Sequence, residues 1–110
     1  MTLKPVVPRE RASQDVEDAV RYYLTDAAPK SVLGFIDALE AAYSHIARHP
    51  AIGSPRYAHA LDLPGLRVWP LGQFPYLVFY VERPAHIDVW RVLHGARDIP
   101  AWLREATDAH

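Results

Sequence analysis

The stretch that decides the fold of this chain is residues 66–93, LRVWPLGQFPYLVFYVERPAHIDVWRVL. It holds three runs rich in β-branched and aromatic residues, separated by two short segments that contain Gly or Pro. This pattern predicts strands at 66–71, 76–82 and 87–93 joined by tight turns. Connections this short require antiparallel neighbours, so the three strands form a meander. The nearly unbroken apolar run 76–82 is typical of a central strand that is covered on both faces.

Two amphipathic helices are predicted before the meander, because apolar residues recur there at helical spacing. We expect Ser13 to cap the first helix, which ends near Asp26, and Pro29 to lie in the first turn of the second. A link of about three residues makes the two helices an antiparallel hairpin. Gly34 lies inside the second helix at a cost of about 1 kcal/mol relative to Ala, and we expect it to mark a close helix crossing.

The remaining segments are expected to be short or irregular. Residues 3–8 contain two prolines and suit an edge strand. Residues 50–65 are predicted to be a loop, and Asp98 is expected to cap a short final helix. The prediction is one α+β domain over residues 1–110: an N-terminal strand, then an antiparallel two-helix hairpin packed on a small antiparallel β-meander, then a short C-terminal helix.

The composition excludes several classes of protein. The chain has 110 residues and no cysteine, so disulfides, thiolate catalysis and zinc–thiolate sites are ruled out. No apolar run is long enough to span a membrane, and because residues 1–10 lack an apolar core we expect no secretory signal there. We therefore expect a cytoplasmic protein.

The net charge of −1 hides an uneven distribution. Residues 1–47 hold five basic and seven acidic residues, whereas residues 48–104 hold seven arginines and four acidic residues. Arginine suits bidentate recognition of carboxylates and phosphates. We therefore expect the C-terminal half to contact an acidic partner or a nucleic acid.

The strand at 87–93 carries one arginine on an otherwise apolar face. Strict alternation puts Ile87, Val89, Arg91 and Leu93 on one face, opposite Asp88, Trp90, Val92 and His94. Arg91 has two interpretations: it pairs with Glu82 or Asp98 at an edge, or it contacts RNA or a protein partner.

Two further clusters could carry chemistry. His94 and Arg97 could supply an acid–base group and an anion clamp for phosphodiester cleavage, or they could form a capping cluster bonded to nearby backbone. Arg67 and Trp69 share a face, which could bind single-stranded nucleic acid or a peptide, although aromatic side chains in a small sheet also fill its core.

No cofactor or metal site is expected. His45 and His49 are one helical turn apart, but the Glu that follows the first His in a zinc-protease helix is absent. The glycines form no phosphate loop or dinucleotide fingerprint, and no Ser-centred hydrolase turn occurs. Asp15, Glu17 and Asp18 are interpreted as a solvated helix start.

Four segments carry a family resemblance: DVEDAVRYYLTDAAP at 15–29, FIDALEAAYSHIARHPAIGSPR at 35–56, GLRVWPLGQFPYLVFYVE at 65–82 and VWRVLHGARDIPAWL at 89–103. The most specific piece is RVLHGARD at 91–98. Together they make residues 3–104 similar to the ParE-like branch of the RelE/ParE superfamily, the toxins of type II toxin–antitoxin pairs. The resemblance implies the same order of helices and strands as the patterns above.

The resemblance implies two possible activities. RelE-like members cleave mRNA on the ribosome with a set of basic residues, and the matching positions here are Arg67, Arg91, His94 and Arg97. ParE-like members poison DNA gyrase and carry no catalytic centre. The lysines and the tail tyrosine of RelE-type enzymes are missing here, and arginine is a poor acid or base. We therefore expect a gyrase inhibitor that is not an enzyme; the alternatives are a ribosome-dependent endoribonuclease and a degenerate binding module.

The resemblance also implies a ParD-like antitoxin, with a DNA-binding domain and a flexible C-terminal segment, in a hetero-oligomer with the toxin. That segment could add a strand at a sheet edge or lay a helix in a groove. The expected antitoxin contacts are Tyr22, Tyr23, Arg56, Tyr57, Arg67, Trp69 and Arg91, of which Tyr23 also belongs to the predicted core. The expected contacts with the target, gyrase or alternatively the ribosome, are Arg97, Trp102 and Leu103.

Overall fold

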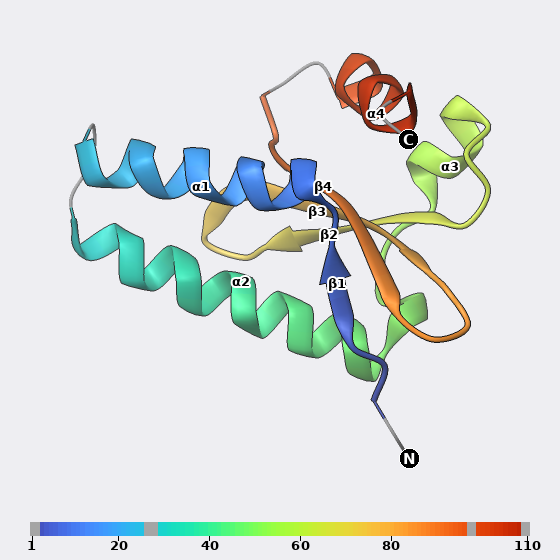
Figure 1. The fold of residues 1–110 in the computed structure, drawn as a ribbon, viewed down its shortest axis with the longest axis horizontal. Helices are drawn as coiled ribbons and strands as arrows, with labels where there is room; N and C mark the ends of the chain where they lie inside the picture. Colours follow the sequence, from blue (N-terminus) through green and yellow to red (C-terminus); the bar gives the residue numbers. More distant parts are fainter. Residues whose placement is uncertain (1–2, 26–28, 97–98, 109–110) are drawn as a thin grey trace.

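The computed structural model describes residues 3–25, 29–96 and 99–108. Figure 1 shows two long helices on one side of a twisted sheet and two shorter helices at its other side. In the described residues, none of the helices combines the length and the apolar character needed to cross a membrane. The elements in chain order are β1 (Val6–Pro8), α1 (Glu10–Thr25), α2 (Lys30–Arg48), the 3₁₀ turn η1 (Pro50–Ile52), α3 (Arg56–Leu61), β2 (Leu66–Leu71), β3 (Phe74–Glu82), β4 (Ile87–His94) and α4 (Ile99–Asp108).

The four strands form one sheet in the order β1-β4-β3-β2. The antiparallel β2-β3-β4 meander is confirmed, and β1 extends it by pairing parallel to β4. The apolar run of β3 lies in the middle of the meander with both faces covered, as expected: Tyr80 packs on one side and Phe79 on the other.

The helical hairpin covers one face of the sheet. Its apolar stripe meets aromatic side chains of β3, where the ring centroids of Tyr23 and Phe35 lie 5.3–6.4 Å from those of Phe74 and Tyr76. Gly34 faces this cluster, and a Cβ there would lie 3.2 Å from the ring of Phe74. The expected reason for this glycine, a helix crossing, is therefore wrong: the close neighbour is a side chain of the sheet.

The first helix begins earlier than its sequence suggests. Helix α1 begins at Glu10, and the backbone N–H of Ser13 donates to the carbonyl of Arg9 at 3.0 Å. Ser13 is therefore inside the first turns and does not cap the helix. The second helix, α2, ends at Arg48, two residues before Pro50.

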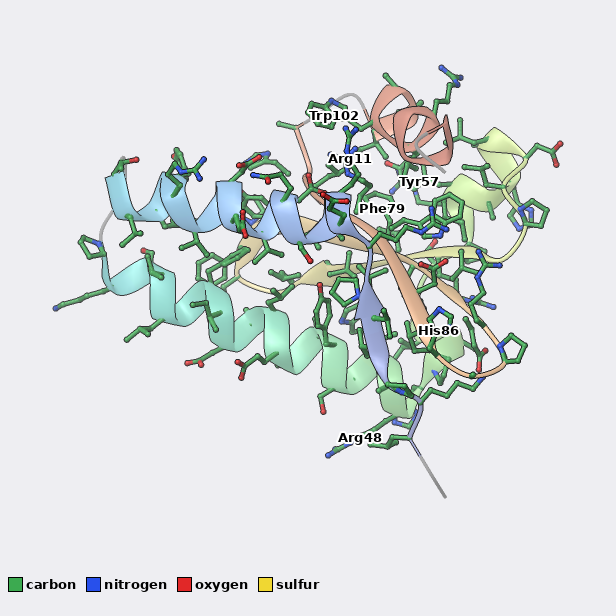
Figure 2. The ribbon with its side chains drawn as sticks, viewed as in Figure 1. Arg11, Arg48, Tyr57, Phe79, His86 and Trp102 are labelled. Carbon is green, nitrogen blue, oxygen red and sulfur yellow. The ribbon has the colours of Figure 1, made fainter. Side chains whose placement is uncertain are left out.

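The opposite face of the sheet is covered by α3 and α4. The expectation of an irregular loop over 50–65 is wrong for Arg56–Leu61, which forms α3. Tertiary packing stabilises this short helix, since Tyr57 lies against Phe79 with ring centroids 5.5 Å apart (Figure 2). Helix α4 contributes Ile99 and the fully buried Leu103 to the same cluster.

A β-bulge interrupts the alternation of β4. Phe79 pairs with Arg91 and the next residue, Tyr80, pairs with Val89, so Trp90 is the extra residue. The bulge turns Arg91 toward the face of α3 and α4, whereas Val89 faces the hairpin. The prediction that Ile87, Val89, Arg91 and Leu93 share one face is therefore wrong. Ile87 and Val89 face the hairpin, whereas Arg91 and Leu93 lie on the opposite face.

Both edges of the sheet are protected against further pairing. On β2, the N–H and C=O of Val68 bond to Ser54 at 3.0 and 2.9 Å, and Pro70 has no N–H to offer. The other edge, β1, is three residues long and ends in Pro8. Short edges that contain proline resist the addition of another strand.

Candidate functional site

A groove of about 400 Å³ lies between α1, the end of β4 and α4. It brings together three residues that the sequence assigned to three different roles: Tyr22, expected at the antitoxin; His94, the nuclease candidate; and Trp102, expected at the target. Tyr22 keeps 51 % of its surface exposed. The other lining residues are Asp15, Asp18, Ala19, Tyr76, Val92, Leu93 and Ala96.

A buried ion pair lies beside the groove. The guanidinium of Arg91 donates to both carboxylate oxygens of Asp15, at 2.7 and 2.8 Å, and to the carbonyl of Trp102 at 3.4 Å. The indole of Trp102 also covers the guanidinium, 4.9 Å from its centroid. Arg91 is 2 % exposed, so its charge serves the fold and is not presented to a partner. Glu82, one of its expected partners, binds Lys4.

Asp15 is the important residue that the sequence analysis missed. Its side chain is 9 % exposed, which corrects the interpretation of a solvated helix start. Besides Arg91, it accepts the backbone N–H of Val92 at 3.0 Å, on the stretch of β4 beyond the end of β1. A signal was present: Asp15 lies on the helix face between Ala12 and Ala19, which are both buried.

The negative charge of Asp15 also affects Tyr43, a residue of α2 on the hairpin side of the sheet. Burial raises the pKa of Tyr43 to about 12, and the Asp15 carboxylate contributes to the shift. Tyr43 on α2 therefore remains a neutral hydroxyl at physiological pH.

His94 makes the backbone hydrogen bond that the capping interpretation predicted. Its Nδ1 accepts the N–H of Ala96 at 3.0 Å, and its ring meets Tyr76 edge-on at 5.3 Å. With Nδ1 occupied as an acceptor, a neutral ring carries its proton on Nε2. In this tautomer His94 carries a hydrogen-bond donor on Nε2.

The other nuclease candidates do not join His94. Arg67 lies on the hairpin face of β2, where its Nη1 donates to the carbonyl of Gly53 at 2.8 Å, and Arg91 is buried on the opposite face. Arg97 and Asp98 lie outside the described residues. Among the described members of the set, no two guanidinium groups converge on the imidazole.

The expected antitoxin contacts are divided among separate places. Tyr23 is in the core, and Arg56 covers the ring of Tyr57 at 4.7 Å on α3. Arg67 and Trp69 do share a face, and the indole of Trp69 lies 5.1 Å from the ring of His45. Of the target candidates, Trp102 lines the groove, whereas Leu103 is fully buried and packs the core.

A second buried carboxylate holds two more arginines. Asp88 accepts hydrogen bonds from Arg9 at 2.9 and 3.0 Å, from Arg83 at 3.1 and 3.2 Å, and from the indole N–H of Trp90 at 3.1 Å. Burial opposes the ionisation of Asp88, but the hydrogen bonds and charge of Arg9, with the bonds from Arg83 and Trp90, lower its pKa. Two arginines of the basic C-terminal half, Arg83 and Arg91, thus pair with carboxylates of the same chain, and of these only Arg91 is fully buried.

The family model described as the ParE toxin of the type II toxin–antitoxin system, parDE, matches residues 6–99. The chain belongs to the ParE toxin family. It is therefore a toxin of the type II toxin–antitoxin class.

The fold of this toxin is shared with a solved structure described as the chromosomal ParDE TA system from P. aeruginosa. The TM-score is 0.69 at 15 % sequence identity, over 84 % of this chain and 96 % of that one. No curated protein sequence shows significant similarity to the toxin. Among the described residues, no three His, Asp or Glu side chains are grouped to hold a metal ion.

Proposed function

We propose that this toxin acts in the cytoplasm by binding DNA gyrase, without a catalytic centre of its own, and that a ParD-like antitoxin neutralises it in a hetero-oligomer. The observation that carries the proposal is the burial of Arg91 in its bidentate pair with Asp15. In-line RNA cleavage needs a base, an acid and charge stabilisation of the phosphorane at one place. With Arg91 neutralised, Arg67 on the other face and His94 lacking a free Nδ1, the described residues supply no such combination.

The groove between α1 and α4 is the surface best suited to the antitoxin. The protected sheet edges argue against an added strand, because Val68 is already paired and β1 is short. The groove instead exposes aromatic surface from Tyr22 and Trp102, which suits the apolar face of an amphipathic helix. Of the two modes expected from the sequence, the helix in a groove is therefore the proposed one.

The target is tested with purified components. Toxin is added to DNA gyrase and relaxed plasmid, and both supercoiling and cleaved DNA are measured; the same toxin is added to ribosomes translating a defined mRNA. We expect loss of supercoiling or accumulation of cleaved DNA, with intact mRNA. Cuts in the mRNA with gyrase unaffected would establish the endoribonuclease, and no effect in either assay would establish the degenerate binding module.

A variant of His94 gives an independent test of the absence of catalysis. We expect His94→Ala to leave toxicity on expression within a few-fold of the wild type, because the ring accepts a local backbone N–H and packs on Tyr76 but has no catalytic role in this proposal. A general acid or base contributes about 10²–10⁴-fold to a rate. A loss of toxicity above about 100-fold, with the fold intact and with the half-buried control His86→Ala unaffected, would refute the proposal.

The groove is tested by antitoxin binding. Tyr22→Ala removes an exposed aromatic side chain from the groove, and we expect it to weaken binding by at least about tenfold, as for an interface hot spot. The control is Leu33→Ala, which removes a side chain that is 70 % exposed on α2 and does not line this groove. Equal effects of the two variants in calorimetry would place the antitoxin elsewhere.

A further inference from the structure

Two histidines lie side by side at the C-terminal end of α2. His45 is in the last turn of the helix, and His49 is the C-cap residue that directly follows Arg48. Their ring centroids are 5.4 Å apart at an angle of 63° between the ring planes, and both residues are exposed.

This separation fits a shared metal ion. A metal binds imidazole nitrogen at about 2.0–2.1 Å, so two rings on one ion at a tetrahedral angle have centres about 5.2 Å apart. His45 and His49 meet this distance in the structure without any change of the backbone. The missing Glu that argued against a zinc protease is irrelevant here, because a site that only binds a metal needs no general base.

The surroundings leave the pair available and favour a cation. The ring of His45 packs on the indole of Trp69, with centroids 5.1 Å apart and the ring planes tilted by 31°, and this contact restricts the orientation of the imidazole. In the described part of the chain, neither imidazole takes part in a hydrogen bond. The carbonyl end of α2 carries partial negative charge, which attracts a cation. Arg48 lies at the same end of the helix (Figure 2) and is exposed, so solvent and salt screen its charge.

We propose that His45 and His49 form a two-histidine site for a borderline transition-metal dication of the Zn²⁺, Ni²⁺ or Cu²⁺ type. Imidazole is a favoured ligand for these ions. Water molecules occupy the remaining coordination positions. Because the ion links the last turn of α2 to the C-cap residue that follows it, it stabilises the C-terminal end of α2. The unfolding temperature then rises as the free energy of unfolding grows by RT ln(1 + [metal]/Kd). The site is independent of the target of the toxin.

Trp69 makes the site measurable. Cu²⁺ quenches the fluorescence of a nearby indole, so titration of the untagged full chain with Cu²⁺ reports on occupancy. We expect saturable quenching that is strongly reduced in Trp69→Phe, although Trp90 and Trp102 remain. Equal quenching in Trp69→Phe would place the metal away from α2 and would overturn the proposal.

The ligands are tested by calorimetry with Zn²⁺ and Ni²⁺. We expect His45→Gln and His49→Gln each to weaken binding by at least about tenfold, since one imidazole cannot chelate. The matched control is His59→Gln, an exposed histidine on α3, which retains wild-type affinity. Binding that is unchanged in both α2 variants, or that falls equally in the control, would show adventitious surface binding only and refute the site.

Discussion

The two faces of the sheet are stabilised in different ways. The hairpin face is an apolar layer in which Tyr23 and Phe35 pack on Phe74 and Tyr76. The face toward α3 and α4 also has an apolar cluster, but it holds the buried carboxylate of Asp88 and the buried guanidinium of Arg91.

The difference shows that contacts between residues far apart in the sequence are harder to predict than contacts encoded within one element. On the hairpin face, the apolar spacing within each helix already indicates which residues are buried. On the other face, Arg91 pairs with Asp15 across 76 residues and Asp88 pairs with Arg9 across 79. A buried charge requires its partner, so each of these pairs links the start of the chain to the final strand.

The largest expected effect is the loss of one member of the buried pair. Arg91→Ala leaves the Asp15 carboxylate without its main partner, and we expect the free energy of unfolding to fall by about 3–5 kcal/mol. Urea denaturation measures the loss. The double variant Asp15→Leu/Arg91→Met removes both charges and should recover most of it, whereas a double variant that loses the sum of the two single costs would show that the pair is not the source of the stability.

A smaller, pH-dependent effect is expected at Asp88. Asp88→Asn weakens hydrogen bonds to three donors, so we expect a loss of about 1.5–3 kcal/mol at pH 7. Because the folded protein lowers the pKa of Asp88, its contribution is full above the ordinary value near 3.8 and disappears as the pH falls through the lower folded value. The difference in free energy of unfolding between wild type and Asp88→Asn, measured by urea denaturation, should therefore become smaller in that acid range.

The apolar face supplies the control for this pH dependence. Phe35→Ala removes a fully buried ring and no charge, so its cost should stay constant over the same pH range. If the difference in free energy of unfolding between wild type and Asp88→Asn also stays constant with pH, the Asp88 side chain contributes by packing and not by charge.

The smallest effect is expected on the hairpin face at Gly34. Alanine gains about 1 kcal/mol of helix propensity over glycine, but its methyl group lies 3.2 Å from a ring of Phe74 that is held between Tyr23 and Phe35. We expect a net loss below about 1 kcal/mol in thermal unfolding. A gain in stability would show that Phe74 can move, and that the aromatic layer is less rigid than its packing suggests.

The sequence predicted most of the fold because most elements are locally encoded. The meander, the hairpin and the edge position of β1 follow from apolar spacing and from Gly and Pro at the connections. Helix α3 was missed because Tyr57 packs on Phe79, a residue of a distant strand. The start of α1 was misplaced because Glu10 begins the helix without the Ser cap that the pattern favoured.

The site was harder to predict than the fold. The bulge at Trp90 reverses the orientation of Arg91, and strict alternation along a strand cannot show an inserted residue. Tyr22, His94 and Trp102 come from three elements whose meeting depends on the packing of α1 and α4. Their residue types were identified in the sequence, but their shared groove is a property of the assembled chain.

The pairing of Val68 with Ser54 has a consequence for the toxin in isolation. An uncovered sheet edge is a place where a second copy of the same chain can pair. An open β2 edge would allow two sheets to join and copies to polymerise. Two backbone hydrogen bonds, together with the Pro70 amide nitrogen that carries no hydrogen, therefore protect the β2 edge against pairing with a second copy of the chain.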